Sequence, residues 1–202
     1  MGADVGMALS GRRVDYSEWL TQERFEREDE LWSGENLWLR RDYAGLLQRW
    51  CPDEAPRVLE YGCGSGLVAQ HLSGHYAYLG VDANPYCVER ARERNPGRVV
   101  LCEDLRRVEL GSDWGVVCAF ALLKHFSLDE WDAVARKVLE SARTAVFTMT
   151  VADEDREDNC VFPHVWVSRK RLVRVIWQAG HRLVETDSDQ AEREWTVITS
   201  RR

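Results

Sequence analysis

A glycine-rich turn followed by a distant aspartate is the part of this chain best suited to chemistry. Residues 58–61 are mostly apolar, and residues 62–66 carry glycine at every second position. Glycine lacks a Cβ and adopts positive φ, so a ligand can approach such a turn closely. A second run, residues 78–81, ends in Asp82, whose carboxylate suits the two hydroxyls of a ribose. The spacing predicts a nucleotide-binding site beside two strands.

The glycine spacing and the preceding acid narrow the class of nucleotide. In dinucleotide-binding turns, the third glycine comes three residues after the second. Here Gly66 comes only two residues after Gly64, which disfavours a nucleotide-dependent reductase. Glu60 would repel a pyrophosphate but suits a cationic ligand. The pattern resembles motif I of the class I S-adenosylmethionine (SAM)-dependent methyltransferases. The resemblance covers roughly residues 57–200, and it implies a methyl-transferring enzyme with SAM as its cofactor.

The resemblance also implies a set of cofactor-binding residues. In the family, the turn passes beneath the methionine part of SAM, and the acid after the second strand accepts both ribose hydroxyls. The residue after that acid lies beside the adenine, which is also bound by an acid and a backbone N–H after the third strand. The residue after the fourth strand lies near the methyl group. The matching residues here are Glu60, Tyr61, Gly62, Cys63, Gly64, Gly66, Asp82, Ala83, Asp104, Leu105 and Phe120.

The fourth predicted strand departs from the family pattern. The family often has an aspartate at its start, where this chain has Gly115, with Asp113 two residues earlier. This change keeps open the alternative of a non-catalytic SAM-binding scaffold. His125 follows the strand and is the candidate catalytic base, because histidine titrates near neutrality. A base is needed only if the acceptor must lose a proton, and a histidine bonded to backbone is the structural alternative.

The composition of the chain disfavours several classes of binding partner. The 202 residues carry a net charge of −7, and an acidic protein is a poor general binder of nucleic acid. The six cysteines form no Cys-x-x-Cys pair, so we expect free thiols and no metal site. No apolar run has membrane-spanning length, and no signal-peptide pattern is present at the N-terminus. These features predict a cytoplasmic protein without a membrane partner, and they leave the oligomeric state open.

Alternating strand and helix patterns predict an α/β fold. With the resemblance, they indicate a Rossmann-like seven-stranded sheet of order 3-2-1-4-5-7-6, mostly parallel with an antiparallel last strand and with helices on both faces. We expect a helical lid at 1–50 and a methyltransferase domain at 51–202. The expected strands are 57–61, 77–81, 98–102, 116–120, 145–151, 182–186 and 194–199.

The acceptor is expected above Phe120, between the N-terminal lid and a polar loop after the fifth strand. Aromatic side chains in these two segments suit a small planar or apolar molecule. We therefore predict methyl transfer to oxygen or nitrogen of a small molecule. An RNA or protein methyltransferase is the alternative, disfavoured by the lack of a basic stripe and of a Pro-Pro-Tyr motif. The aromatic residues are Tyr16, Trp19, Trp32, Phe162, His164 and Trp166.

Overall fold

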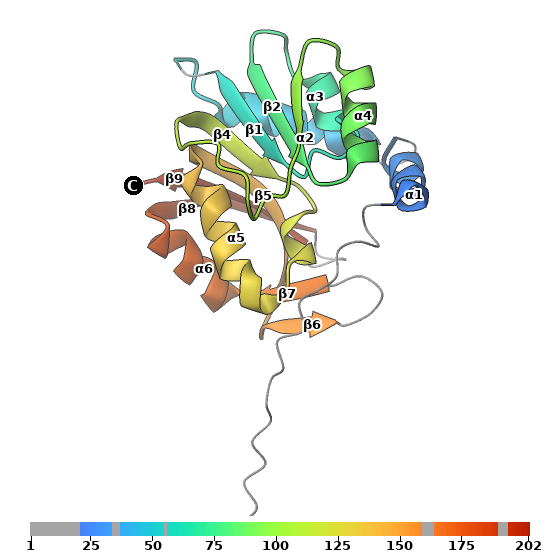
Figure 1. The fold of residues 1–202 in the computed structure, drawn as a ribbon. Helices are drawn as coiled ribbons and strands as arrows, with labels where there is room; N and C mark the ends of the chain where they lie inside the picture. The colour runs from blue at the N-terminus through green and yellow to red at the C-terminus, as the bar shows by residue number, and fades with distance from the viewer. Residues whose placement is uncertain (1–20, 34–36, 55, 159–163, 190–193) are drawn as a thin grey trace, which may run out of the picture.

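The structure is a computed structural model that describes residues 21–33, 37–54, 56–158, 164–189 and 194–202 (Figure 1). Its helices are α1 (Gln22–Ser33), α2 (Leu37–Trp50), α3 (Leu67–His71), α4 (Pro85–Arg94), the short 3-10 helix η2 (Leu123–His125), α5 (Leu128–Glu140) and α6 (Arg169–Gln178). Its strands are β1 (Arg57–Tyr61), β2 (Ala77–Asp82), β3 (Val99–Cys102), β4 (Trp114–Ala119), β5 (Ala142–Ala152), β6 (Arg156–Asp158), β7 (His164–Ser168), β8 (His181–Asp189) and β9 (Glu194–Arg201). No helix of the described ranges is long and apolar enough to cross a bilayer.

The main sheet has the predicted strand order. β3, β2, β1, β4 and β5 are neighbours in that order and run parallel. β9 lies antiparallel against β5, and β8 lies antiparallel against β9. Numbering these seven strands in chain order gives 3-2-1-4-5-7-6, so the predicted topology is confirmed. Parallel order places the carboxyl ends of β1, β2 and β4 at one edge, where ligands bind in open α/β sheets.

The segment after β5 is not the polar loop that the sequence predicted for it. β6 and β7 form an antiparallel hairpin, and β7 also pairs in parallel with the last residues of β5. Val165 and Val167 are fully buried, whereas His164 and Trp166 are only partly buried. This alternation is typical of a strand with one face on the core, and acidic residues around it masked the pattern.

The hairpin is fixed to the start of α5 by ionic contacts. Arg171 donates to Asp132 Oδ1 at 2.6 Å and to Asp155 Oδ2 at 3.1 Å. Glu157 on β6 accepts a hydrogen bond from the Leu128 backbone N–H at 3.0 Å, where the helix N-terminus favours a negative charge. The hairpin therefore has a defined position beside η2 and the carboxyl end of β4.

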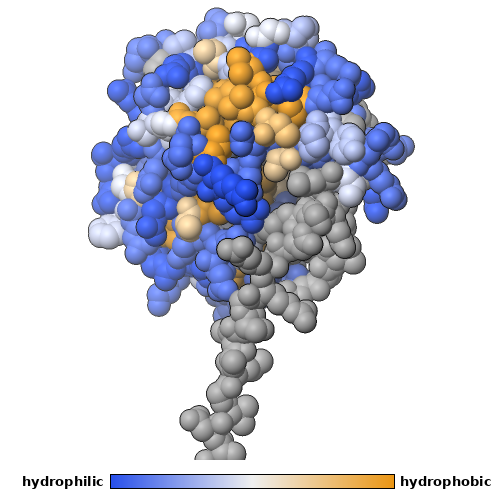
Figure 2. Space-filling model, in the orientation of Figure 1, coloured by the Kyte–Doolittle hydropathy of each residue, from blue (hydrophilic) through white to orange (hydrophobic). Residues whose placement is uncertain are grey.

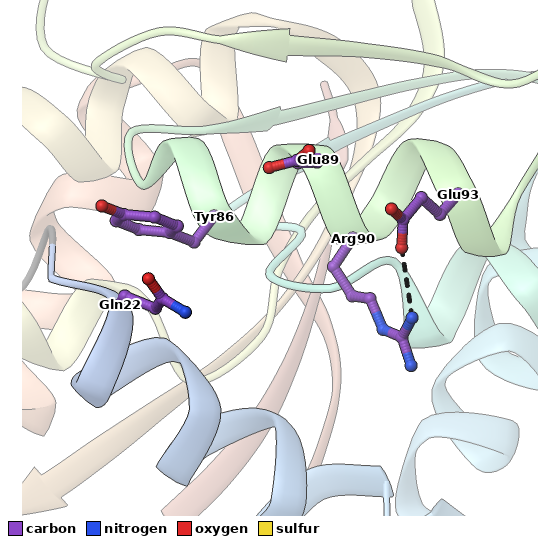
Figure 3. A pocket seen from close by; sticks show the side chains of 5 residues that line it. All are labelled: Gln22, Tyr86, Glu89, Arg90 and Glu93. Carbon is purple, nitrogen blue, oxygen red and sulfur yellow. Dashed lines mark hydrogen bonds and ion pairs between the residues drawn. The ribbon is translucent and has the colours of Figure 1, made fainter.

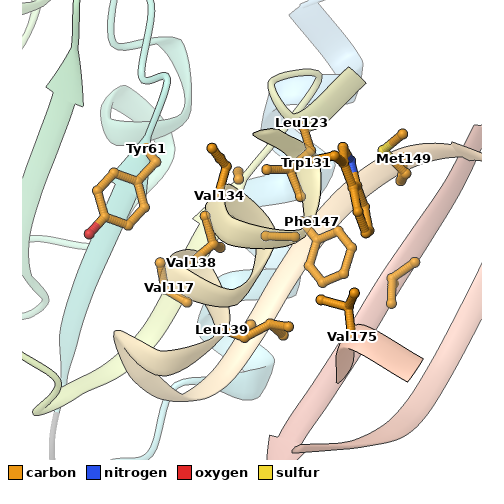
Figure 4. Close-up of a cluster of buried hydrophobic side chains, with 14 of the residues drawn as sticks. Tyr61, Val117, Leu123, Trp131, Val134, Val138, Leu139, Phe147, Met149 and Val175 are labelled. Carbon is orange, nitrogen blue, oxygen red and sulfur yellow. The ribbon is translucent and has the colours of Figure 1, made fainter. Parts of the chain in front are cut away.

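Helices cover both faces of the sheet. α5 and α6 pack on one face around the buried Trp131 and Phe147, as Figure 4 shows. α2 and α3 pack on the other face, where Leu47 and Val58 are fully buried. Residues 103–113 connect β3 to β4 without a helix, and Figure 2 shows hydrophobic surface in the region where Figure 1 shows β2 and β3. Val99 is 56% exposed there.

His181 makes folding stability depend on pH. Its ring is buried beside the Thr199 hydroxyl, and burial, together with the charge of Arg201, lowers its pKa to about 4. The unfolded chain takes up this proton near pH 6.5, so stability falls as the pH drops from 6.5 towards 4. We expect the wild type to lose about 2 kcal/mol more than His181→Gln between pH 7 and pH 5, measured by urea unfolding. Equal losses in the two proteins would contradict this assignment.

Candidate active site

The glycine-rich turn connects the end of β1 to α3 and needs its glycines for conformation. Gly62, Gly64 and Gly66 have φ values of 68°, 52° and 76°, in the left-handed region. The Gly62 N–H donates to the Val81 carbonyl at 2.8 Å, which ties the turn to the end of β2. The turn therefore lies at the carboxyl edge of the sheet, directly beside Asp82.

Asp82 is held so that both of its carboxylate oxygens have a fixed position. Oδ2 accepts from the Gly64 N–H at 2.9 Å, and Oδ1 accepts from the Asn84 N–H at 2.8 Å. Each oxygen has a second lone pair, so the carboxylate can still accept two hydroxyl groups. Burial raises the pKa of Asp82, although the two backbone N–H groups act in the opposite direction. The residue keeps a small exposed fraction at the carboxyl edge of the sheet.

Glu60, Tyr61 and Cys63 are the buried part of this site. Glu60 is 1% exposed, and its Oε2 accepts from the Tyr78 hydroxyl at 2.7 Å. The Tyr61 side chain lies in the core, with its hydroxyl 3.1 Å from Ser141 Oγ. Burial raises the pKa of Cys63 well above its usual value, so this residue is a thiol rather than a nucleophilic thiolate. Only the backbone of Tyr61 and Cys63 is in a position to approach a ligand in the turn.

The segment expected beside the adenine carries an ion pair that the sequence did not suggest. Arg106 Nε donates to both Asp104 oxygens at 3.0 Å, and its Nη2 donates to Oδ2 at 2.6 Å. These bonds lower the pKa of Asp104, although partial burial acts to raise it. An adenine amine would have to share this carboxylate with Arg106, and the role of Asp104 stays a prediction. Leu105 is buried, and Ala83 is exposed.

Phe120 does not present its ring to an open site in this structure. The ring is 3% exposed and stacks on Tyr43 of α2, with centroids 3.9 Å apart. The next residue, Ala121, has φ of 54°, which is strained for a residue with a Cβ. Its N–H donates to Thr148 Oγ1 on β5 at 2.7 Å. The backbone at 120–121 is therefore the well-fixed feature at the end of β4.

His125 lies in a group of partly buried rings next to the carboxyl end of β4. Its ring centroid is 6.3 Å from that of His164 on β7, and His164 stacks on Trp166 at 4.2 Å. We call His125, His164 and Trp166 the aromatic cluster. The structure thus brings together three of the predicted acceptor-side residues. Tyr16, Trp19 and Phe162 and the side chain of Trp32 lie outside the described part of the chain.

Asp113 is remote from these residues. It accepts a hydrogen bond from Arg57, and both residues lie at the amino ends of their parallel strands. The Arg57 guanidinium also lies 4.5 Å from the centre of the Trp114 ring. Asp113 therefore does not replace the acid missing at Gly115.

Sequence reasoning missed the residues that hold the turn from the α4 side. Asn95 Nδ2 donates to the Gly66 carbonyl at 2.9 Å, and Arg94 Nη1 donates to the Ser65 carbonyl at 2.7 Å. Both donors lie about thirty residues from their acceptors, and their local sequence indicates only the end of a helix before Pro96. No local pattern could have identified these contacts.

Replacing different glycines of the turn should reduce the stability of the fold by different amounts. A Cβ at Gly66 would lie 2.5 Å from Asn95 Nδ2, whereas a Cβ at Gly64 would meet no atom within 4 Å. We expect Gly66→Ala to lower the free energy of unfolding by about 2–5 kcal/mol, the sum of left-handed strain and overpacking. Gly64→Ala should cost only the strain, about 1–2 kcal/mol. Urea unfolding of both variants checks the order, and an equal loss in both would contradict the packing argument.

The central part of the chain is similar to a known protein family. Residues 58–144 match a family model described as a methyltransferase domain. The chain is similar to methyltransferase domains over this range, which is less than half of its length. The matched range contains the glycine-rich turn, Asp82, Asp104, Phe120 and His125. The match, together with the sheet topology, confirms the prediction of a class I methyltransferase enzyme. No curated protein sequence matches the chain.

Solved methyltransferase structures share the fold of this chain at low sequence identity. The magnesium protoporphyrin IX methyltransferase of Synechocystis PCC 6803 with bound SAM has a TM-score of 0.75 at 14% identity and covers 96% of this chain and 100% of its own. A TehB-like SAM-dependent methyltransferase of Corynebacterium glutamicum has a TM-score of 0.69 at 17% identity and covers 90% and 100%. The 1,6-didemethyltoxoflavin-N1-methyltransferase of Burkholderia thailandensis has a TM-score of 0.68 at 15% identity and covers 89% and 84%.

Proposed function

We propose that this protein is a cytoplasmic SAM-dependent methyltransferase that methylates oxygen or nitrogen of a small molecule. The observation that carries the proposal is the carboxylate of Asp82, fixed by the Gly64 and Asn84 N–H groups with a lone pair left on each oxygen. This arrangement fits the two ribose hydroxyls of SAM. The open space at the Gly64 Cα position fits the close approach of a ligand to the turn.

The residues of the chain would act mainly by positioning. SAM would supply a methyl group on an activated sulfonium leaving group. Asp82 would hold the ribose, and the turn at 62–66 would place the methionine part beside the end of β4. Orientation of an acceptor against a fixed donor contributes about 7–11 kcal/mol to such reactions. Glu60 lies at the end of β1, directly before the turn, where a carboxylate would favour a cationic ligand.

The aromatic cluster supports a planar or apolar acceptor. The rings of His125 on η2 and His164 on β7 lie edge to face, and Trp166 stacks on His164. Two of the structural neighbours are named for planar ring substrates, a magnesium porphyrin and a toxoflavin precursor. The net charge of −7 argues against a nucleic-acid acceptor. We propose that residues 51–202 form the catalytic domain and that residues 1–50 act as its lid.

The proposal is tested by tracing a labelled methyl group. The protein is incubated with methyl-tritiated SAM and separate pools of small aromatic alcohols and amines, RNA and denatured protein. We expect label in a small molecule, and we expect Asp82→Ala to abolish it. Label only in RNA or protein would contradict the small-molecule proposal. SAM binding with no transfer to any pool would favour the non-catalytic scaffold that the Gly115 substitution kept open.

A further inference from the structure

The N-terminal helix is attached to the glycine-rich turn by one group of side chains. Arg94 of α4 donates to Asp29 of α1 through two nitrogens, at 3.2 and 3.4 Å. The same Arg94 Nη1 donates to the carbonyl and the hydroxyl of Ser65, at 2.7 and 2.6 Å. Ser65 lies between Gly64 and Gly66, so the guanidinium joins α1 directly to the turn. We call Asp29, Arg94 and Ser65 the anchor.

The anchor is shielded from solvent. The Arg94 and Asp29 side chains are only 13% and 15% exposed, which distinguishes this ion pair from weak surface pairs. Partial burial acts to raise the pKa of Asp29, but hydrogen bonds from Ser65 and Arg94 hold it below its usual value. The carboxylate is therefore charged near neutral pH. A bidentate pair of guanidinium and carboxylate fixes the relative orientation of the two side chains in addition to pairing their charges.

A hollow of about 160 Å³ lies between the two helices, lined by Gln22 of α1 and by polar residues of α4, as Figure 3 shows. Arg90 lies on the same side of α4, with its Nε 3.8 Å from Asp29 Oδ2, but it is half exposed. Among the described side chains of α1, Asp29 pairs with two arginines of α4.

The anchor and Asp82 hold neighbouring residues of the turn. Asp82 accepts from the Gly64 N–H, and Arg94 donates to the next residue, Ser65. We propose that Asp29 and Arg94 are positioning residues that set the turn for the cofactor and couple cofactor binding to the docking of α1. The inference rests on the proposed function, because it takes SAM as the ligand of the turn. Coupling of this kind acts in both directions, so the ligand should also stabilise α1.

The test uses S-adenosylhomocysteine as the probe on full-length protein. Calorimetry measures its dissociation constant and stoichiometry for the wild type, Asp29→Asn, Arg94→Lys and the control Glu30→Gln. Glu30 is an exposed acid one residue along α1. We expect Asp29→Asn to weaken binding by about fivefold or more, the lower end for coupled sites, at unchanged stoichiometry. Arg94→Lys keeps the positive charge but cannot form two parallel hydrogen bonds to the carboxylate. Its dissociation constant should lie between those of the wild type and Asp29→Asn. The dissociation constant of the control should match that of the wild type.

Hydrogen exchange supplies the reciprocal readout. The probe should slow exchange of the α1 amides in the wild type and leave them fast in Asp29→Asn. Wild-type affinity in a folded Asp29→Asn protein, or lowered stoichiometry at wild-type affinity, would overturn the positioning role and leave the proposed function intact. Absence of probe binding in the wild type would overturn the proposed function and this inference with it.

Discussion

Replacing Asp82 by alanine should weaken SAM binding by at least about a hundredfold, because two charge-assisted hydrogen bonds, each worth roughly 1.5–3 kcal/mol, are lost together. The carboxylate is fixed by Gly64 and Asn84, so its remaining lone pairs need no rearrangement to accept the ribose hydroxyls. Titration calorimetry of the wild type and the variant measures the change. The melting temperatures without ligand show that both proteins are folded.

Two further variants separate the hydrogen bonds from a general effect of charge. Asp82→Asn retains an acceptor for the Asn84 N–H but places an amide group against the Gly64 N–H, so it should also bind SAM poorly. Glu103→Gln removes an exposed acid at the end of the neighbouring strand β3 and should bind like the wild type. A folded Asp82→Ala protein with wild-type affinity would make Asp82 a purely structural residue.

His125→Asn should lower the methyl-transfer rate by about 10²–10⁴-fold if the acceptor is a hydroxyl, the range typical of general base catalysis. His125 lies after β4 in the aromatic cluster, where an acceptor would meet the end of the strand. SAM affinity should not change, because the ring belongs to the acceptor side. The pH–rate profile should also lose an ionisation near neutrality.

The matched control for this change is His75→Asn. His75 is an exposed histidine before the amino end of β2, where its Nδ1 lies 2.8 Å from Ser73 Oγ. It should leave the rate and the pH profile unchanged. If the acceptor is a neutral amine, the transfer step needs no base and His125 would only orient it. An active His125→Asn protein with the wild-type pH profile on a hydroxyl acceptor would return His125 to a structural role.

The fold could be predicted because its signals are local. Asn84 accepts from the Tyr86 and Cys87 N–H groups as the N-cap of α4, and Ser168 accepts from the Arg171 N–H as the N-cap of α6; both are cap residues of a common type. The apolar runs of β1, β4 and β5 are buried on both faces, as parallel strands require. The β6–β7 hairpin was missed because short strands among many charged residues give a weak pattern.

The site could be predicted only in part, because packing between distant elements decides the rest. The turn and Asp82 lie side by side as the spacing indicated, since adjacent parallel strands end at one edge. No local pattern could show that Tyr43 covers Phe120 or that Arg106 holds Asp104. Side-chain contacts of this kind depend on the tertiary arrangement rather than on residue type.

The central claim is that the turn at 62–66 and Asp82 bind SAM, and calorimetric titration of the purified protein with SAM and S-adenosylhomocysteine tests it most directly. We predict that each chain binds one molecule of either ligand, whereas NAD and NADP do not bind. Ligand at about a hundred times its dissociation constant should raise the free energy of unfolding by about 2.7 kcal/mol. A folded protein that binds neither SAM nor S-adenosylhomocysteine would contradict the claim.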